Sequence, residues 1–496
     1  MAVSTNAEVS ESQAPPKQVT KNAIIYFIGQ LLSWIATFCA VSIIPDKIGV
    51  VAQGQIALVT SRVLLFAPLI AFGVDIYLIK EIGKDRNRAE ELVRSTLGLR
   101  IFLFPFLILL SLLSLSLTKE QNPLIWKMGY LGIMFVCSAF FSDILRATLS
   151  GWEQAQKVSL TELVFSVSPL IAIPFLRFGN PLPLSLTAFL GVLFVLIMRW
   201  YWVSRQFALK PIFNFEIWKE LLRGGMPFVA NNMLLQLLMA IAVFMLEHLD
   251  GVEAIGIYWQ AVKLFGAFLF IPTALGMALL PSLSRLGEAD KKEMGEIQER
   301  VMLLLIVTGL PIVTLVMLLT ESLSKILYKD QTYQAVNLVL QVYALAIIPM
   351  YLVSALYQFL VAQNRGGIWT RFLVISVGVY SISAWFLIPF TRDHYHNGAI
   401  GAVGATVISE TCSAIFAFWI LGNNPFHRET IFRILRAIVA TFCMTVVIWF
   451  TRKMFILIPT ILGCSVFAFL AWKLRVLGEE EQNKLAHLIN SKLRRR

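Results

Sequence analysis

Two cations stand inside long apolar stretches of this sequence. Arg62 interrupts the apolar run 54–79, and Lys263 interrupts the run 255–281. A charge near the centre of a bilayer costs at least about 2.5–3.5 kcal/mol on insertion scales, so each cation requires an explanation. A guanidinium binds phosphate oxygens as a fork, and an ammonium binds them as a compact charge. We predict that both residues bind an anionic phosphate group in a central cavity. The alternative is that each pairs with a neighbouring carboxylate or with carbonyls and only locks helices together.

Carboxylates also occur within or near the apolar runs. Glu162 and Glu410 are candidates for ion coupling, because burial without a partner favours the protonated form of a carboxylate. They are equally candidates for partners of the two cations. Asp75 lies near the end of its run and close to Lys80, where a gate or a structural ion pair is expected.

Uncharged polar residues mark two further apolar runs. Amides and hydroxyls at membrane depth can hydrogen-bond sugar hydroxyls, and they can equally bond one helix to another. We predict that these side chains line the polar part of the cavity: Gln30, Ser33, Thr37, Asn231, Asn232 and Gln236.

The elements that position these residues are membrane helices. Of 496 residues, 57% are hydrophobic and 15% are charged, which is too apolar for a water-soluble fold. Runs of about 20 apolar residues span a bilayer as helices, and breaks at Pro, Gly and charged residues separate fourteen such runs. The 42 Lys and Arg fall mainly in alternate loops, which predicts both termini in the cytoplasm. The net charge of +12 therefore fits anionic lipid headgroups and argues against nucleic acid as a partner.

The first half of the chain resembles the second. Gly54 aligns with Gly256, Gly83 aligns with Gly287, and Pro68 lies near the counterpart of Pro272. Six crossings return the chain to the same side, so the halves form a parallel repeat around one cavity. Proline at these positions is expected to bend its helix.

These features define the predicted fold class: an all-α integral membrane protein with 14 transmembrane helices, in two six-helix bundles plus two extra C-terminal helices. The expected divisions are a cytoplasmic tail over 1–22, bundles over 23–203 and 224–421 joined by a cytoplasmic linker over 204–223, two last helices over 431–472, and a basic tail over 473–496. The five cysteines lie in apolar runs without metal-ligand spacing, and no phosphate-binding loop motif is present. We therefore expect no metal, no cofactor and no ATPase.

Five stretches in this order carry a resemblance to a family: "FGVDIYLIKEIGKD", "ILRATLSGWEQAQKVSL", "LLRGGMPFVANN", "GIYWQAVKLFGAFLFIPTALGMALLPSLSRL" and "NGAIGAVGATVISE". With the helix count, they make the chain similar to the polysaccharide exporters, or O-antigen-type flippases, of the multidrug/oligosaccharidyl-lipid/polysaccharide (MOP) exporter superfamily. The resemblance extends through about 400 residues.

The resemblance implies a transporter of lipid-linked oligosaccharide in a prokaryotic cytoplasmic membrane, used for surface polysaccharides. Its implied partners are that substrate, membrane lipids, a coupling proton or sodium ion, and a polysaccharide polymerase or glycosyltransferases. Two alternatives stay open: an ion-coupled multidrug or cation antiporter of the same superfamily, and a membrane glycosyltransferase or ligase. A basic cavity disfavours the antiporter, and short outer loops disfavour the enzyme.

Overall fold

The described part of the protein is helical throughout. The computed structural model describes residues 16–119, 122–272, 275, 291–328, 334–362, 366–421, 426–476 and 478, and within these ranges it forms no β-strand. Helices predominate because an α-helix satisfies its own backbone hydrogen bonds, which lipid cannot do. The α-helices are α1 (Pro16–Ile48), α2 (Val50–Leu64), α3 (Ala67–Ala71), α4 (Val74–Lys84), α5 (Ala89–Ser116), α6 (Pro123–Gly151), α7 (Ala155–Ala172), α8 (Leu182–Ser204), α9 (Phe215–Leu249), α10 (Val252–Phe265), α12 (Lys291–Leu327), α13 (Ala335–Ala344), α14 (Ile347–Ala362), α15 (Gly366–Tyr395), α16 (Gly398–Leu421), α17 (Arg428–Thr451) and α18 (Leu457–Lys473).

Most of these helices have the length and composition of membrane spans. In the described ranges, 12 helical segments qualify, and α13 with α14, bent by 49°, makes up to 13. Helix α18 is apolar but has only 17 residues. The all-α membrane fold is therefore confirmed, while the count of 14 spans stays a prediction.

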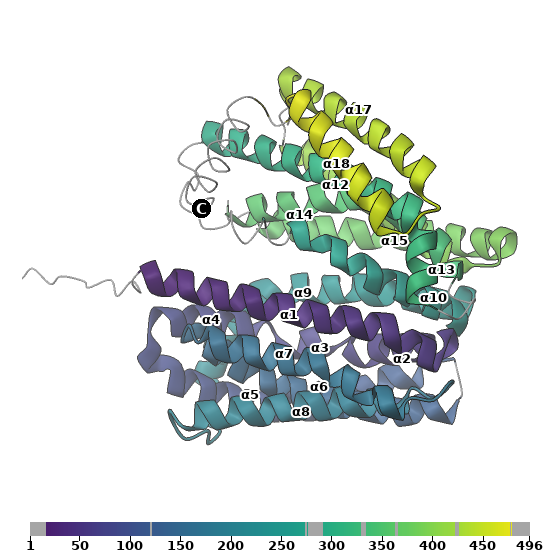
Figure 1. Ribbon diagram of the computed structural model, residues 1–496. Helices are drawn as coiled ribbons and strands as arrows, with labels where there is room; N and C mark the ends of the chain where they lie inside the picture. The colour runs from purple at the N-terminus through teal and green to yellow at the C-terminus, as the bar shows by residue number, and fades with distance from the viewer. Residues whose placement is uncertain are drawn as a thin grey trace, which may run out of the picture.

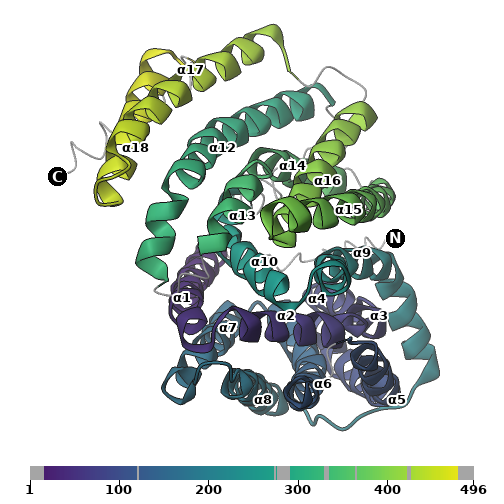
Figure 2. The same cartoon turned by 90° about the vertical axis from the view of Figure 1, so that its right-hand side faces the viewer.

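The helices form two groups with α9 between them. Figure 1 shows α1 to α8 in the lower group and α10 to α18 in the upper group. Helix α9 packs against α15 of the upper group and against α2, α3, α4 and α5 of the lower group. Helices α17 and α18 lie at the edge, packed on each other and on α12, as Figure 2 also shows. This is the arrangement expected for two helices outside the repeat.

Apolar contacts between the two groups are concentrated toward one end, in the part of the chain that the structure describes. Under the predicted topology the α1–α2 junction faces outward, and we call this the outer end. One large buried cluster combines residues of both groups, and at this end it contains Val50, Leu246 and Ala254. At the opposite end the clusters are separate: one contains Ile82 with the start of α9, and the other contains Trp369. The shared core therefore closes the outer end.

Helices α2 and α10 cross at the two glycines that the repeat aligned. A Cβ placed on Gly54 would lie 2.0 Å from the Val252 carbonyl oxygen and 3.0 Å from the Gly256 nitrogen. A Cβ on Gly256 would lie 2.1 Å from the Val50 carbonyl oxygen. Only glycine permits this approach, so the internal repeat places its own corresponding residues in contact.

Several helix boundaries differ from the predicted divisions. Helix α1 begins at Pro16 inside the expected tail, and α9 begins at Phe215 inside the expected linker, because its Asn214 side chain accepts hydrogen bonds from the first turn. The second helix of the first half is broken near Pro68, as predicted: α2 ends at Leu64, α3 holds the proline, and α4 follows. Most of the predicted basic tail, from 479 onward, lies outside the described residues.

Candidate functional site

Arg62 is paired in a buried contact between α2 and α9. Its guanidinium forms an ion pair with the Glu247 carboxylate, and the two side chains are only 6% and 2% exposed. The guanidinium carbon lies 4.2 Å from the centroid of the Phe244 ring. The other oxygen of Glu247 accepts a hydrogen bond of 2.8 Å from the backbone nitrogen of Lys119. Glu247 thus ties α9 to two segments of the lower group.

The end of the same helix is tied to the upper group. Asp250 accepts a hydrogen bond of 2.7 Å from the Gly398 nitrogen at the start of α16, and Arg392 donates one of 2.6 Å to the Leu249 carbonyl. Residues 247 to 250 therefore hold both groups together at the outer end. We call this segment with its partners the outer clasp.

Lys263 and Glu410 lack such partners. Lys263, on α10, is partly buried, with its Nζ 5.7 Å from the centroid of the Trp259 ring. Glu410, on α16, is also partly buried. Neither forms an ion pair with a described residue, and they do not pair with each other. Both charges are therefore partly buried without a compensating charge among the described residues.

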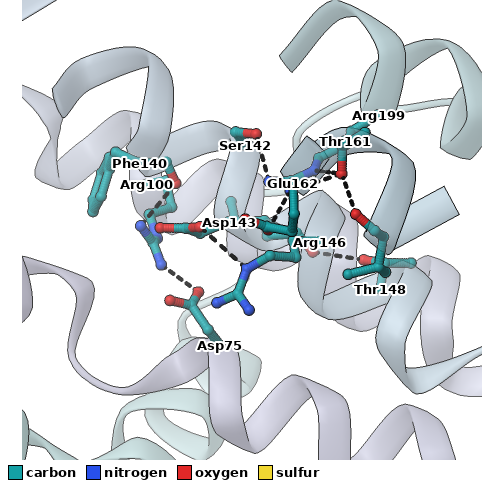
Figure 3. A network of polar contacts seen from close by, with 12 residues as sticks. Asp75, Arg100, Phe140, Ser142, Asp143, Arg146, Thr148, Thr161, Glu162 and Arg199 are labelled. Atoms are coloured by element: carbon teal, nitrogen blue, oxygen red, sulfur yellow. Dashed lines mark hydrogen bonds and ion pairs between the residues drawn. The ribbon is translucent and has the colours of Figure 1, made fainter. Parts of the chain in front are cut away.

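The lower group contains a balanced network of charges, drawn in Figure 3. Arg100 on α5 donates a hydrogen bond of 2.5 Å to the Asp75 carboxylate and one of 2.8 Å to the Phe140 carbonyl. On α6, Arg146 and Asp143 stand three residues apart and form an ion pair at 3.4 Å.

Arg199 on α8 connects this network to α7. It donates to the Glu162 carboxylate at 2.9 Å, to the Thr161 hydroxyl at 2.9 and 3.1 Å, and to the Ser142 hydroxyl at 3.0 Å. Three arginines thus face three carboxylates, and Glu162, a candidate for ion coupling, has its charge compensated. This arrangement links five helices of the lower group, α4 to α8.

The predicted Asp75–Lys80 pair does not form. Five residues along a helix correspond to about 140° around its axis, so the two side chains point in different directions. Asp75 bonds to Arg100 instead, and Lys80 is exposed with no ion pair to any described residue. A gate at Asp75 stays a prediction, with Arg100 as the partner.

The polar residues predicted for the cavity form few hydrogen bonds with other described side chains. Thr37 donates to the Ser33 carbonyl on α1 at 2.8 Å, and the Ser33 hydroxyl and the Asn231 side-chain oxygen are buried without a hydrogen-bond partner. Gln30, Asn232 and Gln236 are partly buried. Within the described ranges, no hydrogen bond links the α1 residues to the α9 residues. A cavity lined by both sets stays a prediction.

Three buried charges were missed from the sequence. Arg100 and Arg199 are 2% and 4% exposed inside helices, although the charge pattern of the sequence assigns them to loops. Glu247 is the third of these buried charges. Each of Arg100, Arg199 and Glu247 stands near the end of an apolar run, where a charge looks like a loop residue. The cost of a charge at membrane depth, which identifies Arg62, identifies these three residues as well when it is applied to the ends of the apolar runs.

Comparison with known proteins identifies the class. The family model "Polysaccharide biosynthesis protein" matches residues 19–287, and the model "MatE" matches residues 227–386. No curated protein sequence matches the chain significantly. The fold is that of the MOP superfamily of flippases and transporters, and the chain belongs to the polysaccharide biosynthesis protein family.

Solved structures agree on the fold. The lipid II flippase MurJ in an inward closed conformation superposes with a TM-score of 0.72 at 13% identity, over 91% of this chain and 98% of that one. An inward-facing multidrug resistance MATE transporter of the MOP superfamily gives 0.64 at 17% identity, over 80% and 97%. An outward-facing one gives 0.54 at 16% identity, over 82% and 94%. These similar structures are flippases and transporters, and together with the two family models they confirm the expected superfamily.

Proposed function

We propose that this protein translocates lipid-linked oligosaccharides, carried on polyprenyl pyrophosphate, across the cytoplasmic membrane for surface polysaccharide biosynthesis. The family match over more than half of the chain and the flippase-like fold support this function. The fold neighbours, being transporters and flippases, argue against the glycosyltransferase alternative.

The observation that carries the proposal is Lys263. A partly buried ammonium with no carboxylate partner in the described structure is costly at membrane depth, and a bound anion would remove that cost. The pyrophosphate of the substrate is such an anion. We assign Lys263 as the direct phosphate ligand, while Glu410 remains the better candidate for ion coupling because Glu162 is paired with Arg199.

Arg62 has a conditional role in this proposal. While the outer end is closed, its charge is neutralised by Glu247. Alternating access requires the two groups to separate at the outer end, and that motion would free the guanidinium for phosphate. Arg62 would then bind substrate only in the outward-open state.

Flipping in proteoliposomes tests the function. Purified protein is reconstituted with a fluorescent polyprenyl-pyrophosphate oligosaccharide, and flipping is followed as loss of access to an added glycosidase. We expect Lys263→Ala to abolish flipping and Lys263→Arg to retain part of it. Lys325→Ala, which removes an exposed lysine at the outer end of α12, is the matched control. Full flipping by Lys263→Ala would refute the phosphate assignment, and no flipping by the unmodified protein would refute the function.

One observation favours the antiporter as a second candidate. The MatE model matches residues 227–386. The same vesicles, loaded with a fluorescent organic cation under a pH gradient, separate the two functions. Cation efflux without oligosaccharide flipping would assign the protein to the antiporters.

A further inference from the structure

A polar cavity lies at the edge of the upper group, where α12, α17 and the turn after α18 meet. Its volume is about 650 Å³, and it is lined by Glu296, Glu299, Arg300, Leu303, His427, Glu429, Thr430, Arg433, Arg436, Arg475 and Gly478. Under the predicted topology α12 and α17 begin at the inner face and α18 ends there. The cavity therefore lies at the depth of the inner headgroups.

Arginine dominates the charge of this cavity. Four arginines and His427 face three glutamates, and two of those glutamates are already engaged within the wall. Glu299 accepts hydrogen bonds from the backbone nitrogen and the ring of His427, at 2.6 and 2.5 Å. Glu429 pairs with Arg433 at 2.6 Å.

Two of the arginines keep donors available for a ligand. Arg300 is exposed and forms no ion pair with any described residue. Arg436 is exposed and donates one hydrogen bond, of 3.3 Å, to the Leu474 carbonyl. A guanidinium has five N–H donors in a planar fork, so both residues can still bind phosphate oxygens.

The cavity opens beside an apolar helix face. Ile431, Phe432, Leu435 and Ile438 of α17 are 45–50% exposed, in the first turns that follow the cavity. Large apolar side chains exposed on a membrane helix face acyl chains. A ligand with a phosphate in the cavity would have its hydrophobic part along this face.

We propose that this cavity binds the phosphate of an anionic lipid headgroup of the inner leaflet. Arg300 from α12 and Arg436 from α17 reach the phosphate from two sides, so the lipid bridges these helices. It thereby fastens α17 and α18 to the rest of the upper group, of which they contact mainly α12. The proposal does not depend on the transported substrate.

Lipid binding tests the proposal directly. Purified full-length protein is titrated with a fluorescent short-chain phosphatidylglycerol in neutral detergent, without any glycan lipid. The double variant Arg300→Gln/Arg436→Gln is expected to bind about 30-fold more weakly, from two arginine–phosphate contacts. Arg428→Gln is the matched control, because Arg428 is in the first turn of the same helix but lies over Phe432 and does not line the cavity. Melting temperatures in the same detergent identify variants that fail to fold.

The outcomes separate the sources of phosphate. Unchanged lipid affinity in the folded double variant would overturn the proposal. Inorganic phosphate that displaces the probe as effectively as unlabelled short-chain phosphatidylglycerol would also overturn it, since it would assign the site to free phosphate. Equal affinity for a zwitterionic lipid would do the same. None of these results bears on flipping, so the proposed function stands or falls separately.

Discussion

The outer clasp makes a quantitative prediction about conformation. With Arg62 and Glu247 only 6% and 2% exposed, removal of either partner leaves an uncompensated buried charge in the outer-closed state. Breaking a buried ion pair in this way costs about 3–5 kcal/mol. Separation of the groups would let water reach the remaining charge, so the cost falls mainly on the closed state. At about 1.4 kcal/mol per tenfold change, the ratio of closed to open molecules should fall more than about 100-fold.

Spin labels at the outer end measure this ratio. Val51 on α2 and Glu253 on α10 are both exposed beside the helix crossing, and the five free cysteines are replaced first. Double electron–electron resonance spectroscopy then reports the distance between the labels. We expect one short distance in the parent protein and a longer distance in Glu247→Met or Arg62→Met.

A double-mutant cycle guards against indirect effects. Replacing both partners by methionine removes both charges, and apolar replacement of a buried pair is often neutral. The double variant should therefore return toward the closed distance. Glu321→Gln breaks an exposed pair with Lys325. It should change the free-energy difference between the closed and open states by at most about 1 kcal/mol. Additive effects of the two single variants, or an unchanged distance in both, would refute the clasp.

Three further predictions follow from individual contacts. Gly256→Ala should open or destabilise the outer end because its Cβ would meet the α2 backbone, whereas Gly378→Ala, with open space around it, should be neutral or stabilising by about 1 kcal/mol in thermal unfolding; equal effects would exclude the tight crossing. The Glu299 carboxylate raises the pKa of His427 above its ordinary 6.5, so this contact stabilises fully below pH 6.5 and is lost as pH rises through the raised value. The decrease in melting temperature caused by His427→Gln should therefore become smaller as the pH rises. The other charges near His427 include Glu296 and Arg300. A decrease that does not depend on pH would contradict this. Arg199→Met should lower the free energy of unfolding by about 2 kcal/mol, because its partner carboxylate is partly exposed, and an unchanged unfolding midpoint would show that the network contributes little.

Much of the fold was predictable because lipid restricts the chain to a few solutions. Long apolar runs predicted the membrane helices, and Pro68 predicted the break between α2 and α4. The repeat predicted that Gly54 and Gly256 correspond, since small residues recur where helices approach closely. That these two glycines touch each other could not be predicted, because a repeat relates positions and does not say which ones meet on the axis.

The candidate site was less predictable, because pairing between distant helices is a tertiary property. Arg62 and Lys263 look equivalent in the sequence, yet among the described residues only Arg62 has a carboxylate partner, supplied by a helix 185 residues further along the chain. Asp75 pairs with Arg100 and not with Lys80, because helix geometry points the side chains of Asp75 and Lys80 in different directions. The sequence identified charges in membrane helices but not their partners.

The distribution of paired and unpaired charges separates scaffold from mechanism. In the lower group, three arginines are matched by Asp75, Asp143 and Glu162, and a neutral, cross-linked network suits a body that moves as a unit. Lys263 and Glu410, in the upper group, have no such match in the described structure. Membrane helices retain an uncompensated charge at a cost, so a function must offset it. We therefore expect the charges that act in transport in the upper group and at the outer clasp, and we expect the lower group to move as a unit.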